Sequence, residues 1–342
     1  MSGIAKKMLQ AAAGQVGDIT PLLVVGATNS PVLTIYNQEI DTFIKLDDPS
    51  TVPSSICRGV AFSSDDTYMA VATNNFVIVY KRSKDVFTAM VFLFAGGTQR
   101  EIAFSSDDTY LAVAHANSPR ISIFKRSGDT FTKLSDPTTL PTGTGYGVAF
   151  SSDDTYLAVA HNTSPFITIY KRSGDTFTKL ANPASLPTGN GRSAAFSSDD
   201  TYLAVALDDT PFIAIYKRSG DTFTRLPSPL VGSIPNDALA VAFSNDTTYM
   251  AVAHVNSPYI SIYKRSGDTF TKLTNPSVLP PSNSNGVAFS KDDAYLAVTS
   301  NTSPFVTIYK RSGDTFTKLA NPAVLPDGAS YGVTFSNTGF PQ

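Results

Sequence analysis

A repeat of about 46 residues runs through almost the whole chain and limits the folds it can adopt. The segment from Gly147 to His161 recurs seven times, and its phenylalanine returns at spacings of 42, 46, 46, 47, 46 and 46 residues. Those phenylalanines are Phe62, Phe104, Phe150, Phe196, Phe243, Phe289 and Phe335. A second segment, Ile169–Leu180, recurs in step with the first. A fixed period of this length is typical of propellers and other repeat architectures.

Each unit divides into four short strands separated by turn residues. In one unit we expect strands at Val148–Ser151, Tyr156–His161, Phe166–Lys171 and Thr176–Leu180. The second of these is nearly all apolar, so it is expected to be buried on both faces, whereas the polar residues of the fourth suit an exposed edge. Ser-Asp-Asp-Thr and Arg-Ser-Gly-Asp supply the residues that tight turns favour.

These features predict an all-β fold, a seven-bladed β-propeller of four-stranded antiparallel blades. Residues 21–46 carry the last three strands of a unit, whereas Tyr331–Ser336 carry only a first strand. The C-terminal strand is therefore expected to complete the first blade and close the ring. This divides the chain into a segment at residues 1–18 and the propeller at 19–342.

The stretch Phe150–Ala158, Phe-Ser-Ser-Asp-Asp-Thr-Tyr-Leu-Ala, resembles the Phe-Ser-Pro-Asp-Gly-x-Tyr-Leu-Ala hairpin of WD-repeat and related bacterial propellers. The resemblance extends over all seven units and implies the propeller fold. The chain has no tryptophan, so the Trp-Asp dipeptide of WD repeats is absent.

The seven copies differ most in the segment that precedes each first strand. Four residues before each repeat phenylalanine stand Arg58, Arg100, Tyr146, Arg192, Leu239, Asn285 and Tyr331. Because the first strand of a blade is innermost, this ring should surround one mouth of the central channel. Arginine, tyrosine and asparagine are common recognition residues, so Arg58, Arg100, Tyr146, Arg192, Asn285 and Tyr331 are the predicted ligand- or partner-binding residues. The alternative is sequence drift in a tolerant loop.

The first 18 residues have no counterpart in the repeat. Ile4, Met8 and Leu9 fall at helical spacing, which predicts a short helix over residues 3–13 that anchors the disc to a protein assembly. No apolar run reaches the roughly 18 residues that span a bilayer, so we expect no membrane insertion.

Composition removes several function classes. The 26 basic and 28 acidic residues give a net charge of −2, which does not favour nucleic-acid binding. The single cysteine, Cys57, excludes an internal disulfide and a cysteine-built zinc site. The three histidines, His115, His161 and His254, end equivalent strands in separate units and are expected to form hydrogen bonds rather than a metal site. The recurring Asp-Asp pairs are expected to stabilise turns rather than bind calcium, and no cofactor is expected.

The sequence interpretation favours a non-enzymatic structural or binding protein, without catalytic residues. The preferred form is a phage virion component, from the tail or surface, or a cell-surface protein that mediates attachment to a protein receptor or glycan through its loop face. That form implies a virion or extracellular location. One alternative is a propeller-type hydrolase or lactonase, for which Glu101, Asp208 and the mouth arginines are the candidates. The other is a cytoplasmic WD-like scaffold.

Overall fold

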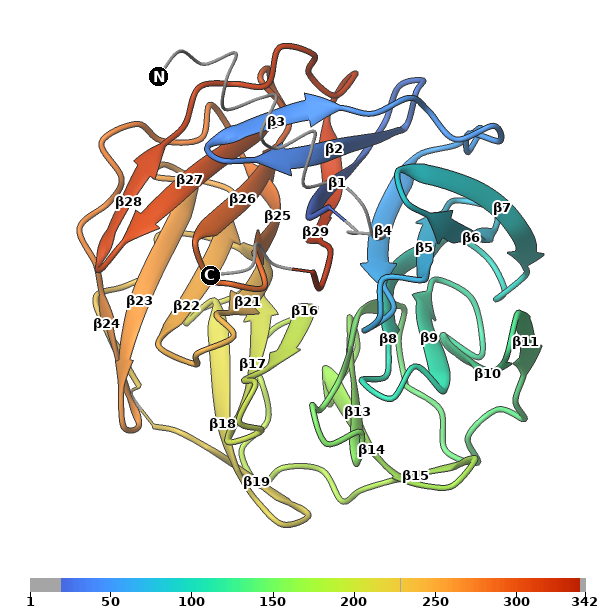
Figure 1. Ribbon diagram of the computed structural model, residues 1–342. Helices are drawn as coiled ribbons and strands as arrows, with labels where there is room; N and C mark the ends of the chain where they lie inside the picture. Colours follow the sequence, from blue (N-terminus) through green and yellow to red (C-terminus); the bar gives the residue numbers. More distant parts are fainter. Residues whose placement is uncertain (1–19, 228, 339–342) are drawn as a thin grey trace.

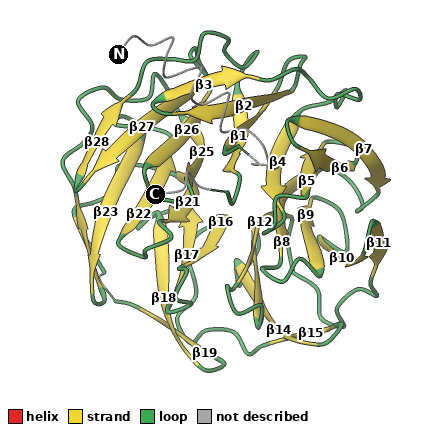
Figure 2. Ribbon diagram, viewed as in Figure 1, coloured by secondary structure: helices red, strands yellow, loops and turns green. Residues whose placement is uncertain are grey.

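The computed structural model describes residues 20–227 and 229–338, and the predicted seven-bladed propeller is confirmed there. Within these residues, 29 strands form seven sheets arranged around a central axis (Figure 1). Loops and turns connect the strands (Figure 2). No helix of the described residues is long and apolar enough to cross a bilayer.

Strand order is the same in every blade, with the first strand of each repeat innermost. The innermost strands are β4 (Cys57–Phe62), β8 (Gln99–Phe104), β12 (Gly145–Phe150), β16 (Gly191–Phe196), β21 (Ala238–Phe243), β25 (Ser284–Phe289) and β29 (Ser330–Phe335). The second strands are β1 (Leu22–Ala27), β5 (Tyr68–Thr73), β9 (Tyr110–His115), β13 (Tyr156–His161), β17 (Tyr202–Leu207), β22 (Tyr249–His254) and β26 (Tyr295–Ser300). Every residue of these second strands is buried, as predicted from their apolar composition.

The two outer strands of each blade are joined by a tight turn. The third strands are β2 (Leu33–Glu39), β6 (Val77–Ser83), β10 (Ile121–Ser127), β14 (Ile167–Ser173), β18 (Ile213–Ser219), β23 (Ile260–Ser266) and β27 (Val306–Ser312). The outermost strands are β3 (Thr42–Lys45), β7 (Val86–Leu93), β11 (Thr130–Lys133), β15 (Thr176–Lys179), β19 (Thr222–Arg225), β24 (Thr269–Lys272) and β28 (Thr315–Lys318). A short extra strand, β20 (Leu230–Val231), pairs in parallel with β24 and was not expected.

Ring closure follows the prediction. The C-terminal strand β29 pairs with β1, so that Leu23 faces Phe335 and Val25 faces Val333. Beyond β29, the backbone amides of Asn337 and Thr338 each donate a hydrogen bond of 2.7 Å to Asp66 in the next blade. The two ends of the chain therefore complete one sheet and also join it to its neighbour.

The hydrophobic core consists of seven clusters, each between two adjacent blades. A second strand contributes one face to each neighbouring cluster; Tyr156 and Ala158 pack on one side, and Leu157 and Val159 on the other. Burial of both faces explains why these strands lack the alternation of a half-exposed strand.

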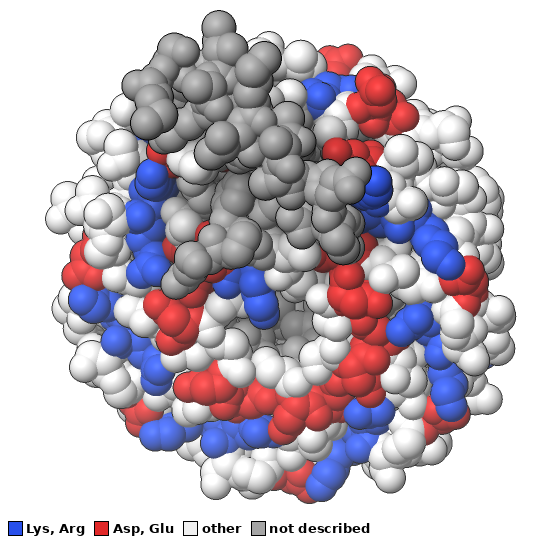
Figure 3. Space-filling model, in the orientation of Figure 1, with Lys and Arg blue, Asp and Glu red and all other residues white. Residues whose placement is uncertain are grey.

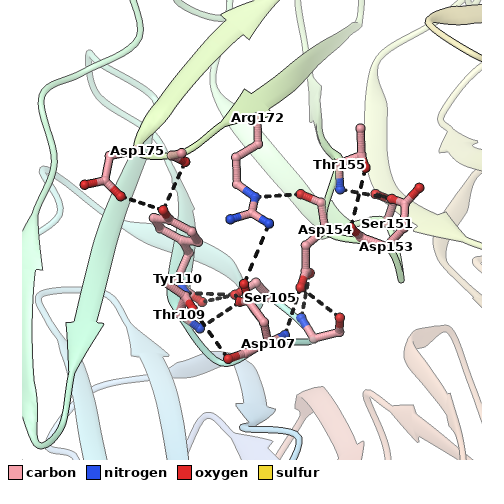
Figure 4. Close-up of polar contacts among 12 residues, drawn as sticks. Ser105, Asp107, Thr109, Tyr110, Ser151, Asp153, Asp154, Thr155, Arg172 and Asp175 are labelled. Carbon is pink, nitrogen blue, oxygen red and sulfur yellow. Dashed lines mark hydrogen bonds and ion pairs between the residues drawn. The ribbon is translucent and has the colours of Figure 1, made fainter.

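The Asp-Asp turns stabilise the structure as predicted, but the two aspartates act differently (Figure 4). Asp153 accepts bonds within its own turn, from Ser151 Oγ at 2.6 Å and Thr155 N at 2.9 Å. Asp154 instead reaches the preceding blade and accepts bonds from Ser106 N at 2.7 Å and Asp107 N at 2.8 Å. Because a carboxylate that accepts backbone N–H bonds is a strong partner, this second aspartate joins adjacent blades.

The Lys-Arg pairs also act between blades. Arg172 donates to the Asp154 carbonyl at 2.7 Å and lies 5.1 Å above the Tyr110 ring of the preceding blade. Its neighbour Lys171 pairs with Asp221 of the following blade at 2.8 Å. Figure 3 shows the resulting bands of basic and acidic side chains around one face of the disc. The exposed pairs among them contribute little to stability, because water and salt screen them.

Candidate active site

The ring of variable residues lines a cavity of about 360 Å³ at one mouth of the central channel. Each blade contributes the second residue of its innermost strand. These residues are Arg58, Arg100, Tyr146, Arg192, Leu239, Asn285 and Tyr331. The six residues predicted from the repeat alignment are therefore brought together in one place.

The sequence interpretation places the ring residues before the innermost strands. In the structure they lie within those strands. In blade four, Gly145 faces His161 and Gly147 faces Ala160, so Tyr146 has no partner across the sheet. The same register shift occurs at the ring position of the other blades. A residue skipped in this way forms a β-bulge, a feature that redirects a side chain beside a functional site. This local geometry explains why all seven side chains face the mouth.

Arginine and tyrosine side chains occupy one arc of the mouth, in the order Tyr331, Arg58, Arg100, Tyr146 and Arg192. The Tyr146 ring lies between two guanidinium groups, with Arg100 at 5.2 Å and Arg192 at 4.9 Å from its centroid. Arg58 lies 5.3 Å from the Tyr331 ring. Each cation–π contact is worth about 0.5 to 2 kcal/mol and fixes the direction of a long side chain. Leu239 and Asn285 complete the ring with no charge, so positive charge gathers on one side of the cavity.

A second ring of mostly small residues lies one position further along the same strands. Its members are Gly59, Glu101, Gly147, Ser193, Ala240, Gly286 and Gly332, and each lines the same cavity except Gly59 and Gly147. Neighbouring strands approach closely here, since a Cβ on Gly147 would lie 2.6 Å from the Cα of Ser193. A Cβ on Gly59 would lie 3.2 Å from Glu101 Oε1. The missing side chain at Gly59 thus leaves room for the Glu101 carboxyl group.

Among the described residues, Glu101 is the one acidic residue in the cavity wall. Desolvation in this setting raises its pKa from 4.5 to about 7, although a weak hydrogen bond from the Ile102 amide favours the ionised form. A carboxyl group with a pKa near 7 can accept a proton at neutral pH, which is the property of a general base. The sequence analysis names Glu101 as a candidate for the hydrolase alternative, but its desolvation becomes evident only in the structure.

Asp208 reaches the mouth through Arg192. Its carboxylate lies 2.8 Å from Arg192 Nη2 and accepts two further bonds from Asn190, at 2.9 Å and 2.8 Å. Among the described residues, Asp208 does not line the cavity itself. Asp208 therefore holds an arginine in place, a contact that no sequence pattern predicts.

The histidines lie away from the cavity and remain separate. Each is buried at the end of a second strand, where its Nε2 bonds to a hydroxyl of the third strand: His115 to Ser122, His161 to Thr168 and His254 to Ser261, at 3.0 to 3.1 Å. Burial lowers their pKa values to about 4. The predicted hydrogen-bonding role is confirmed. No cluster of metal-ligating side chains occurs in residues 20–227 and 229–338.

The predicted anchoring residues Ile4, Met8 and Leu9 lie outside the described residues. The anchoring role of residues 1–18 therefore stays a prediction.

Comparisons with known proteins show the fold. No family model and no curated protein sequence matches the chain. Among solved structures, a candidate 6-phosphogluconolactonase from Bacteroides uniformis is similar with a TM-score of 0.76 at 14% identity, over 93% of this chain and 100% of the other. The periplasmic gluconolactonase of Pseudomonas aeruginosa gives a TM-score of 0.73 at 14% identity, over 93% and 99% of the two chains. A protein of unknown function from Desulfotomaculum acetoxidans gives 0.73 at 13%, over 94% and 100%.

These neighbours correct the sequence-based function. The leading interpretation, a non-enzymatic virion or cell-surface attachment protein, is wrong, because propellers of the same shape and length are named as lactonases and none of these three is named as a virion, tail or adhesion protein. The expectation that the protein has no enzymatic role is likewise unsupported. The hydrolase alternative, with Glu101 and the mouth arginines, agrees better with these neighbours.

Proposed function

We propose that this protein is a lactone hydrolase whose active site is the cavity at the channel mouth. The observation that carries the proposal is the placement of one half-buried carboxyl group, Glu101, in a cavity wall that also carries Arg58, Arg100 and Arg192. The raised pKa of Glu101, about 7, supports the same role. Hydrolysis of an anionic ester requires a general base and positive charge close to the reacting carbonyl group. Glu101 and the three arginines provide both in one small cavity.

In the proposed reaction, ionised Glu101 accepts a proton from a water molecule while the water oxygen attacks the lactone carbonyl carbon. A guanidinium group of the wall stabilises the negative charge that develops on the carbonyl oxygen. The ring C–O bond then breaks, protonated Glu101 returns its proton to the ring oxygen, and the product is the open-chain hydroxy acid. The remaining cationic surface binds an anionic group of the substrate, such as a phosphate or carboxylate.

The named activities of the neighbours supply the substrates to test: gluconolactone and its 6-phosphorylated form. We expect the purified full-length protein to hydrolyse both near neutral pH, followed as acid release above the uncatalysed rate. The phosphorylated lactone should have the larger kcat/KM, by about tenfold or more, because charge-assisted bonds to arginine add binding energy.

A variant on the opposite face provides the control. Lys125 of β10 pairs with Asp175 of the next blade and does not line the cavity, so Lys125→Ala should leave both rates unchanged. Absence of turnover above the uncatalysed rate, with either lactone, would overturn the proposed function.

A further inference from the structure

The three mouth arginines differ in what faces them from the next loop of their own blade. The facing position lies sixteen residues after the ring position, as the contacts of Arg58 with Asn74, Arg192 with Asp208 and Asn285 with Asn301 show. In blade order from Arg58, the facing residues are Asn74, Ala116, Asn162, Asp208, Val255 and Asn301. For the three arginines, this repeat position therefore carries an amide (Asn74), a methyl group (Ala116) and a carboxylate (Asp208).

Arg192 is held by a charged partner. Its Nη2 lies 2.8 Å from Asp208 Oδ2, and the Asp208 carboxylate is itself fixed by the backbone and side-chain nitrogens of Asn190. Because the Asp208 charge offsets the guanidinium charge, Arg192 offers an incoming anion less attraction than a free arginine does.

Within residues 20–227 and 229–338, neither Arg58 nor Arg100 forms an ion pair of this kind. Arg58 Nε donates to the neutral amide of Asn74 at 3.1 Å. The repeat position equivalent to Asn74 in the blade of Arg100 is Ala116, which has no polar side chain. The buried Nε of Arg100 has no hydrogen-bond partner in residues 20–227 and 229–338; Arg192 Nε has none either, but its Nη2 is paired. Burial lowers the pKa of Arg58, and repulsion from Arg100 lowers it further, which indicates that the two positive charges act on the same space.

We propose that Arg58 and Arg100 form the anion-binding subsite of the cavity, for a phosphoryl or carboxylate group, and that Asp208 is a positioning residue that keeps Arg192 from competing for that group. The subsite thus lies in blades two and three, on the side of the mouth that also carries Glu101. This inference refines the proposed function, on which its substrate rests, but binding of inorganic phosphate tests it independently.

The experiment measures inorganic phosphate binding to the full-length protein by calorimetry. Ala116→Asp places a carboxylate opposite Arg100, as Asp208 stands opposite Arg192, and should weaken phosphate binding about tenfold or more. Val255→Asp is the matched control, since Val255 occupies the same repeat position opposite uncharged Leu239 and is likewise half-buried. It should change the affinity by less than about threefold. Equal weakening by the two variants would overturn the subsite.

Asp208→Asn tests the positioning role. Release of Arg192 should tighten phosphate binding about threefold or more and lower KM for a phosphorylated lactone, with kcat little changed. Weaker phosphate binding in Asp208→Asn would instead place the anion on the Arg192 and Asp208 pair and overturn the inference, as would a wild-type protein that does not bind phosphate.

A second pair of variants tests the subsite if the first does not fold, and one result separates the subsite from the proposed function. If Ala116→Asp does not fold, Arg100→Gln should weaken phosphate binding about tenfold or more and Arg192→Gln by less than about threefold, and the reverse order would contradict the proposal. Phosphate binding with the expected pattern but without lactone hydrolysis would support the subsite and overturn only the proposed function.

Discussion

Deletion of Tyr331 to Gln342 is expected to destroy the stability of the closed ring. It removes nearly all of β29, including the buried Phe335 ring that lies 6.4 Å from Phe43, and leaves β1 without a partner on one side. It also removes the amides that bind the Asp66 carboxylate. Loss of a buried phenylalanine alone costs about 3 to 5 kcal/mol, and an unpaired strand edge invites association with other chains. We expect aggregation or a fall in Tm of about 10 °C or more.

A peptide of residues 330–342, added in trans, provides the control for this truncation. If ring closure is the cause, the peptide should bind to the open blade and restore part of the lost Tm. Tyr331→Ala in the full-length chain separates the two roles of this strand, because it alters the mouth and leaves the pairing of β29 intact. Calorimetry that shows the same melting profile before and after truncation would mean that the ring does not depend on this strand.

Replacement of Glu101 by glutamine is expected to lower kcat/KM for lactone hydrolysis about 100-fold or more, since glutamine cannot accept the proton from water. Glu39 is the only other glutamate in the chain and is exposed at the end of β2, so Glu39→Gln is the matched control. It should retain the wild-type rate. An active Glu101→Gln variant would exclude Glu101 as the base.

The same substitution should change stability in the opposite sense. The folded-state pKa of Glu101, about 7, lies above its unfolded value of 4.5, so the unfolded chain releases the proton more readily. The contribution of the neutral carboxyl group to stability is complete below pH 4.5 and is lost as the pH rises through 7. At about pH 8, Glu101→Gln should therefore be more stable than the wild type by roughly 2 to 3 kcal/mol, and near pH 4 the two should be equal. Denaturant unfolding at both pH values measures this difference.

The repeat made most of the fold predictable. The spacing of the phenylalanines and the incomplete first unit sufficed for the number of blades and for closure by Tyr331–Ser336. The bounds of the innermost strands were less accurate, since Gly145–Val148 lies in β12 around a bulge and a bulge has no simple sequence period. The parallel pairing of β20 with the outer strand β24 was also not predicted, because it depends on a loop that differs from the corresponding loops of the other blades.

Comparison among the seven copies also located the mouth. Residues such as Arg58 and Tyr146 stood out because the positions around them repeat almost unchanged. The interactions between blades could not be predicted in the same way. Asp153 and Asp154 are adjacent and chemically identical, and only the twist of the chain directs one into its own turn and the other to Ser106.

The sequence-based interpretation underestimates catalysis for a physical reason. An isolated glutamate has a pKa well below 7, so the sequence supports Glu101 only as a candidate for the hydrolase alternative. Its base-like pKa arises from desolvation where the innermost strands converge, beside the space left by Gly59. That environment is a property of the ring and not of the local sequence.

The pH dependence of kcat/KM for gluconolactone tests most directly whether the channel mouth is a lactonase site with Glu101 as its base. The unphosphorylated lactone is the more suitable substrate for this measurement, because a phosphate group titrates near pH 6 and would obscure the enzyme's own ionisation. After subtraction of uncatalysed hydrolysis, we expect kcat/KM to rise about tenfold per pH unit below a pH of about 7 and to level off above it. A profile that is flat across this range, or that falls as the pH rises through 7, would contradict the account.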